Sequence, residues 1–159
     1  NSLINGNIDE AMVKFERVLD DYPDTPGAVQ ALVYLLNNAL DKASTDEKKQ
    51  TIYDLLGNQM PTIEDPLIES AIYKLKGDMQ LVENPTSAKK YYEKAKSNIK
   101  EIGFKQKYSL NIAIAEIKLN NFEDAAATLK SILEDDDIDF AIKNSAEELH
   151  AFVNYKLGI

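Results

Sequence analysis

Residues 6–23 read GNIDEAMVKFERVLDDYP, and their spacing decides the fold. The small residue Ala11 is followed four positions later by the large residue Phe15, and three positions after that by Val18. At 3.6 residues per turn these side chains share one face of a helix, which Pro23 ends. A small residue lets another helix approach closely, and a large one fills the gap between helical pairs. The stretch therefore predicts the second helix of a helix-turn-helix unit.

The same spacing occurs twice more along the chain. Residues 88–95 read AKKYYEKA, and residues 120–132 read NNFEDAAATLKSI. The small residues that start these two faces, Ala88 and Ala125, are 37 residues apart. Two further units with irregular lengths fit between Ala11 and Ala88. The recurrence predicts an array of units, each about 34 residues long.

Apolar periodicity between turn residues predicts an all-helical chain with no strand. Helices are expected to start after capping pairs such as Thr25-Pro26, Asp65-Pro66 and Asn84-Pro85. The predicted helices cover residues 8–19, 25–43, 44–56, 65–81, 86–99, 104–119, 121–133 and 139–157.

Composition excludes several classes of protein. Hydrophobic residues make up 44 % and charged residues 28 % of the 159 residues, which is typical of a folded core. The absence of cysteine excludes disulfides, zinc fingers, iron–sulfur clusters and thiol catalysis. A net charge of −9 is the opposite of what a nucleic-acid partner favours. No apolar run is long enough to span a membrane and no signal peptide is present, so we expect no membrane insertion by this segment.

The charge is unevenly distributed. Residues 86–108 carry seven lysines and two glutamates, a net charge of +5, which leaves −14 for the rest of the chain. One interpretation is electrostatic steering of a protein partner, and the other is a solvated helix face.

At these positions the chain resembles a tetratricopeptide repeat protein, because Ala11, Phe15 and Pro23 fit the family pattern directly. The later units fit it loosely, and the second carries an insertion near residues 43–47. The resemblance implies a right-handed α-solenoid of helical hairpins with about eight helices. It implies one repeat domain over 1–159, with units at 1–23, 24–61, 62–100 and 101–137 and a final helix at 138–157. The first helix of the first unit is expected upstream of Gly6. The family role is a non-enzymatic scaffold that binds a protein or peptide.

A finer likeness concerns the setting of the protein. The stretch DYPDTP at 21–26 is similar to bacterial envelope repeat proteins of the outer-membrane assembly and division-associated type. The stretches LKGD at 75–78 and YEKA at 92–95 resemble the ancillary subunit of the SecYEG translocon. Such proteins are held by one N-terminal membrane helix and place their repeats in the periplasm. The likeness implies the soluble part of an anchored envelope protein, with a cytoplasmic location as the alternative.

No set of residues for catalysis or metal binding stands out. The only histidine, His150, lies near apolar residues on the last predicted helix and is expected to have no catalytic role. The acidic run 135–139 fails as an EF-hand loop, because the required Gly and Glu are replaced by Phe140 and Ala146. We therefore expect no enzyme activity, no metal and no cofactor.

The remaining expectation is binding along the first helices of the units. Amide and tyrosine side chains there are able to hydrogen-bond an extended peptide backbone. The alternative is an ordinary polar surface, and a separate hypothesis is head-to-tail or swapped assembly into a homo-oligomer. The candidate peptide-binding residues are Gln30, Tyr34, Asn37, Asn38, Tyr73, Gln80, Lys107, Lys118 and Lys143, with His150 beside them on the last helix.

Overall fold

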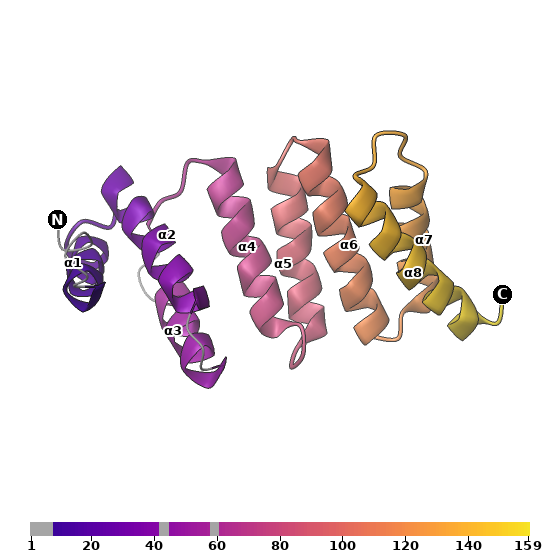
Figure 1. Cartoon of the computed structure of the whole chain (residues 1–159), viewed down its shortest axis with the longest axis horizontal. Coiled ribbons are helices and arrows are strands. Elements are labelled where there is room, and N and C mark those ends of the chain that lie inside the picture. The colour runs from indigo at the N-terminus through magenta and orange to yellow at the C-terminus, as the bar shows by residue number, and fades with distance from the viewer. Residues whose placement is uncertain (1–7, 42–44, 58–60) are drawn as a thin grey trace. The chain divides into compact units, whose positions relative to one another are not determined.

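The computed structural model describes residues 8–41, 45–57 and 61–159, and every regular element within these ranges is a helix (Figure 1). The all-helical prediction is therefore confirmed. The predicted end of the second helix at residue 43 lies outside the described residues. The helices are α1 (Ile8–Asp21), α2 (Pro26–Asp41), α3 (Thr45–Gly57), α4 (Pro66–Gln80), α5 (Pro85–Asn98), α6 (Ile102–Lys118), α7 (Phe122–Leu133) and α8 (Phe140–Leu157).

The chain divides into two compact units, residues 1–64 and residues 65–159. We describe each unit by itself. The single repeat domain over 1–159, with its four units and final helix, remains a prediction from the sequence, and so does the right-handed superhelix.

In the first unit, α2 packs against both α1 and α3. Contacts on two sides explain why α2 is apolar over most of its circumference. Its fully or almost fully buried side chains are Ala28, Ala31, Leu32, Leu35, Leu36 and Ala39. The hydroxyl of Thr25 accepts a hydrogen bond from the backbone N–H of Ala28 at 3.3 Å, which satisfies one of the free donors at the start of α2.

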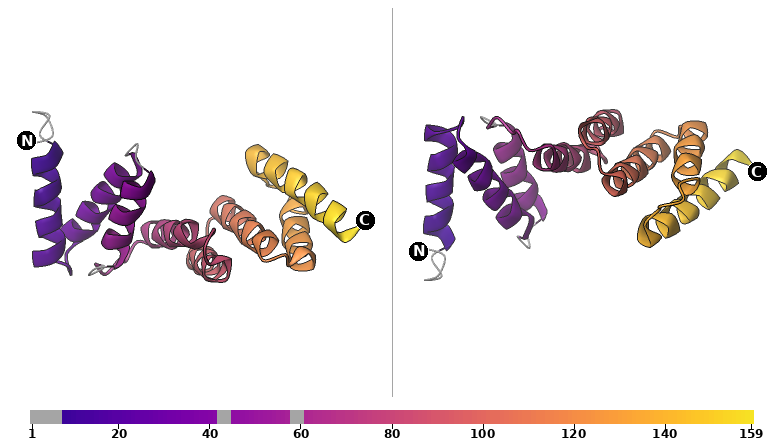
Figure 2. Two further views of the ribbon diagram at one scale, coloured as in Figure 1. Left: turned by 90° about the horizontal axis from the view of Figure 1, so that it is seen from below. Right: turned by 90° about the horizontal axis from the view of Figure 1, so that it is seen from above.

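In the second unit each helix from α4 to α8 packs against the next one, and α6 also contacts α8 (Figure 2). Side-chain caps start three of these helices, and the sequence predicts the caps of α4 and α5. Asp65 caps α4, Asn84 caps α5 and Asp139 caps α8, each through its side-chain oxygen to backbone N–H groups. Because α6 contacts α5, α7 and α8, its side chains face neighbours in several directions.

The residues of the recurring spacing form the core of the second unit. Ala88 and Ala95 are fully buried, and Tyr92 between them is 1 % exposed. Ala125 and Leu129 occupy the same roles on α7, where they pack with residues of α6 and α8. The small residues thus face close helix contacts, and the large ones fill the space between helices.

Candidate functional site

The second unit has a hollow between the N-terminal parts of α6 and α8, which we call the α6–α8 groove. Its volume is about 660 Å³. The residues that line it on α6 recur every three or four positions and therefore share one face of the helix. The lining residues are Glu101, Gly103, Phe104, Lys107, Leu110, Asn111, Asp139, Ala141, Ile142 and Ser145.

The chemistry of the α6–α8 groove is mainly apolar with a few polar groups. Phe104 is 43 % exposed, and Leu110 and Ile142 contribute further apolar surface. The side-chain nitrogen of Asn111 is buried and has no hydrogen-bond partner in the described part of the chain. A buried donor without a partner costs about 1–3 kcal/mol, so this amide favours an acceptor brought by a ligand. Lys107 supplies one positive charge to the lining, and Glu101 and Asp139 supply two negative charges.

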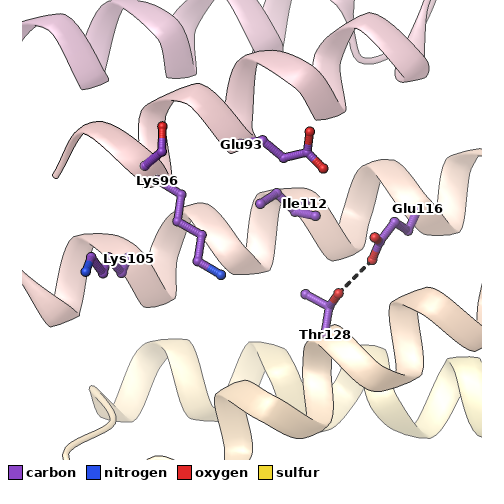
Figure 3. A pocket seen from close by; sticks show the side chains of 7 residues that line it. Glu93, Lys96, Lys105, Ile112, Glu116 and Thr128 are labelled. Atoms are coloured by element: carbon purple, nitrogen blue, oxygen red, sulfur yellow. Dashed lines mark hydrogen bonds between the residues drawn. The ribbon is translucent and has the colours of Figure 1, made fainter. Parts of the chain in front are cut away.

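A second hollow lies between α5, α6 and α7, and we call it the lysine groove. Its volume is about 500 Å³ (Figure 3). In Figure 3, Lys96 and Lys105 lie toward one end, while Glu116 and Thr128 lie toward the other. The lining residues are Glu93, Lys96, Ser97, Lys105, Ile112, Glu116 and Thr128.

Glu116 is the buried carboxylate of this groove, with a residue exposure of 3 %. One oxygen pairs with Lys89 Nζ at 2.8 Å, and the other accepts a hydrogen bond from Thr128 Oγ1 at 2.9 Å. A buried charge needs such partners, because its loss of hydration is otherwise uncompensated. The hydrogen bond to Glu116 raises the pKa of Lys89, against the opposing effect of burial. Lys89 therefore balances the charge of this buried carboxylate, and Thr128 adds a hydrogen bond to it.

The two grooves lie on different faces of α6. Phe104, Lys107 and Asn111 line the α6–α8 groove, whereas Lys105, Ile112 and Glu116 line the lysine groove. At 100° per residue the second set is turned roughly 130° around the helix from the first. A ligand in one groove therefore does not occupy the other.

In the first unit, two of the four predicted binding residues already serve helix packing. The ring of Tyr34 lies 4.4 Å from the ring of Phe15, measured between centroids. The side-chain nitrogen of Asn38 donates to the sulfur of Met12 at 3.3 Å. Both contacts join α2 to α1, which leaves Gln30 and Asn37 as the exposed members of this set.

On α4, the predicted residue Tyr73 lies in an aromatic cluster rather than in either groove. Its ring stacks on Tyr91 at 6.5 Å, and Lys94 Nζ lies 5.6 Å from its centroid. Burial, together with the charge of Glu69 and a hydrogen bond to it, raises the pKa of the Tyr73 hydroxyl. The other predicted residue, Gln80, is half-buried at the end of α4.

On α6 and α8, the predicted residue Lys107 lines the α6–α8 groove, and Lys118 and Lys143 line neither of the two grooves described above. Lys118 and Lys143 are exposed, and His150 is half-buried on α8. Whether any of these residues binds a partner remains a prediction.

The sequence analysis did not name Phe104 or Asn111 as site residues. One feature of the sequence nevertheless indicated Asn111. Asn111 is an amide within the apolar run Leu110 to Ala115. A polar residue at such a position needs a partner or a role. The exposure of Phe104 had no comparable signal, because it depends on the position of α8.

Residues 8–41, 45–57 and 61–159 contain no group of three or more His, Cys, Asp and Glu side chains placed to hold a metal ion. Within the same ranges, no helix has the length and apolar character needed to cross a membrane.

The comparison with protein families finds a match at the start of the chain. Residues 1–25 match the family profile described as tetratricopeptide repeat. The chain contains a tetratricopeptide repeat. The match includes Ala11, Phe15 and Pro23, so the recognition of a tetratricopeptide repeat protein from its sequence is confirmed. A search of curated proteins found no match, and neither did a search of solved structures.

Proposed function

We propose that this tetratricopeptide repeat protein binds an extended peptide segment of a protein partner in the α6–α8 groove. The observation that carries the proposal is the groove itself, in which exposed Phe104 lies beside Leu110, Ile142 and the unpartnered amide of Asn111. Binding sites for peptides combine such apolar surface with a few polar groups that fix orientation. The repeat makes a protein–protein interaction scaffold the expected general role.

The groups of the groove suit a peptide with one apolar side chain next to a free backbone carbonyl. The apolar side chain packs against Phe104 and Ile142, and the carbonyl accepts a hydrogen bond from the Asn111 amide once that side chain turns its buried nitrogen toward the groove. Lys107 favours a carbonyl oxygen at the rim, whereas Glu101 and Asp139, which also line the groove, disfavour an acidic group. Binding without catalysis is the role that the tetratricopeptide repeat supports.

The test is selection of peptides from a displayed library on the full chain, followed by fluorescence polarisation. Phe104→Ala should weaken the selected peptides by about tenfold or more, the usual effect of removing an aromatic anchor. Phe152→Ala is the matched control, because Phe152 is also 43 % exposed and does not line the groove. Equal affinity in the Phe104→Ala and Phe152→Ala variants would overturn the assignment of the groove.

Self-assembly is the second candidate function, and exposed apolar side chains on and after α8 favour it. Phe140 is 77 %, Tyr155 79 % and Ile159 83 % exposed. Association with a second copy of the chain would remove such apolar side chains from water, which is favourable. Light scattering over a range of concentrations is the test. A monomer at every concentration removes this candidate, and an association that Tyr155→Ser weakens supports it.

For the cellular setting, the proposal is the soluble part of a membrane-anchored protein of the bacterial envelope. Its support is the likeness of residues 21–26, 75–78 and 92–95 to envelope repeat proteins, including the ancillary translocon subunit. Fractionation of cells that produce the native protein is the test. Recovery with membranes, with the repeats open to protease from the periplasmic side, supports the proposal. Recovery in the cytosol contradicts it.

A further inference from the structure

The α6–α8 groove carries more negative than positive charge. Its lining holds the carboxylates of Glu101 and Asp139 against the ammonium group of Lys107. None of these three side chains has an ion pair in the part of the chain that the structure describes. A bound peptide of complementary charge pairs with such groups and binds more specifically for it. The excess of carboxylate therefore favours a cationic group in the peptide.

Glu101 is the more available of the two carboxylates. Its Oε2 accepts a hydrogen bond from the backbone N–H of Lys100 at 3.2 Å, and its side chain does not cap α6. By contrast, Asp139 Oδ1 accepts hydrogen bonds from the backbone N–H groups of Ala141 and Ile142 at the start of α8. The positive end of that helix already offsets part of the Asp139 charge. We therefore expect a cation to pair with Glu101.

Three lysines close in sequence to the lining residues do not change the sign of the lining. Lys105 lines the lysine groove, on the other face of α6. Lys100 and Lys143 are exposed and line neither groove. Their charges act on the groove through water, where salt screens them more than it screens a direct pair.

The groups on α6 follow one another in a fixed order. Glu101, Phe104, Lys107 and Asn111 lie three or four positions apart, so they share one face. With a rise of about 1.5 Å per residue, Phe104 lies about 4.5 Å beyond Glu101 along the helix axis. An extended peptide advances about 3.3 Å per residue. The peptide residue that reaches Glu101 is therefore one or two positions from the residue that packs on Phe104.

The turn before α8 adds negative charge beside the groove. Asp136 and Asp137 are exposed and have no ion pair among the described residues. They precede Asp139 by three and two residues, so they lie within about 11 Å of it. This distance is close to the Debye length of about 8–10 Å at physiological salt. Their charge therefore adds to the attraction of a cationic segment toward the groove.

From the charges and their order we infer that the segment bound in the α6–α8 groove carries a basic residue, Lys or Arg, one or two positions from its apolar residue. The basic side chain pairs with Glu101, the apolar side chain packs on Phe104, and Lys107 faces a backbone carbonyl. An acidic residue at the same place would face the carboxylate of Glu101 instead. The inference rests on the proposed function and names the chemistry of its partner.

The probe is the peptide selected on the full chain, labelled with fluorescein and remade with Arg, Gln or Glu at the two positions on either side of its apolar residue. Fluorescence polarisation gives the affinity of each version. The Arg version should bind best and the Glu version worst. Arg should exceed Gln by about 1.5- to 5-fold, as expected for an exposed ion pair. This difference should shrink as salt rises from about 50 to 300 mM.

Variants of the chain locate the pairing. Glu101→Gln should remove the preference for Arg over Gln, and Glu101→Lys should reverse the preference for Arg over Glu. Glu123→Gln is the matched control, because Glu123 is an exposed glutamate on α7 that lines neither groove. It should keep the preference of the wild type. Because the Glu101 side chain does not cap α6, circular dichroism should show the same helix content in every variant.

The outcomes separate this inference from the proposed function. Peptides that depend on Phe104 but bind equally well with Arg, Gln or Glu overturn the inference and leave the proposed function in place. A preference for Arg that persists in Glu101→Gln contradicts the pairing with Glu101. If no selected peptide depends on Phe104, the proposed function is wrong and the inference falls with it.

Discussion

Gly77→Ala tests how closely α4 and α5 pack, because the glycine faces a buried aromatic ring. A Cβ atom on Gly77 would lie 2.4 Å from Cε1, 2.7 Å from Cδ1 and 2.9 Å from Cζ of Tyr92. Carbon atoms prefer about 3.5–4.0 Å, so the ring must move by roughly 1 Å. Tyr92 is only 1 % exposed, and its hydroxyl donates to Asp78 Oδ1 at 2.9 Å. The ring therefore has little room to move without weakening that hydrogen bond.

The expected change in the free energy of unfolding combines two costs and one gain. Overpacking a core costs about 1–3 kcal/mol. Weakening a hydrogen bond to a charged acceptor costs up to about 1.5–3 kcal/mol. Alanine in a helix interior gains about 1 kcal/mol over glycine. The free energy of unfolding should therefore fall by about 2–3 kcal/mol in Gly77→Ala, measured by urea denaturation followed by circular dichroism.

Two further variants show whether the clash is the cause. Gly103→Ala changes the same residue type on α6, where a Cβ meets nothing within 4 Å, so its stability should stay the same or rise slightly. In a Tyr92→Leu background the ring is absent, and Gly77→Ala should cost less than about 1 kcal/mol. A Gly77→Ala protein as stable as wild type would refute the reasoning. An equal loss of stability with and without the Tyr92 ring would refute it too.

Three other predictions concern a turn, a cap and the pH dependence of stability. Asn120, between α6 and α7, has a φ of 58°. Asn120→Val should therefore lower the free energy of unfolding by about 1–2 kcal/mol in urea denaturation, whereas Asn120→Gly should not. Asp139 accepts hydrogen bonds from two backbone N–H groups at the start of α8. Its replacement by alanine should cost about 1 kcal/mol in thermal denaturation, and a similar loss in Asp136→Ala would contradict the cap. Burial, with a contribution from Asp78, raises the pKa of Tyr92 well above its ordinary value of 10.0. The unfolded chain then releases protons that the folded chain retains, so stability should be full below pH 10 and should fall above it. Urea denaturation from pH 8 to pH 11 should show a smaller fall in Tyr92→Phe, and an equal fall would contradict the assignment to this hydroxyl.

The sequence predicted the helices because their signals are local. The alternation of small and large side chains at Ala88, Tyr92 and Ala95 marks the packed face, and all three are buried. Caps such as Asp65 act within one turn of their own helix, so their role is readable without a structure.

The candidate binding surfaces were less predictable, because they depend on how neighbouring helices are rotated. Tyr34 and Asn38 carry suitable groups, but the rotation of α2 directs both toward α1. The sequence indicated the positive charge of segment 86–108 but not which way its lysine side chains point. Contacts of α5 with α6, and of α6 with α7, place Lys96 and Lys105 along one groove.

The central claim is that a peptide lies in the α6–α8 groove, and a chemical-shift map by NMR tests it most directly. The full chain is titrated with a peptide selected from the library, and shifts of backbone and side-chain amides are followed to saturation. The account predicts the largest shifts at the side-chain amide of Asn111 and at the backbone amides of Phe104 and Ile142. Saturable binding that leaves these three residues unshifted would contradict it.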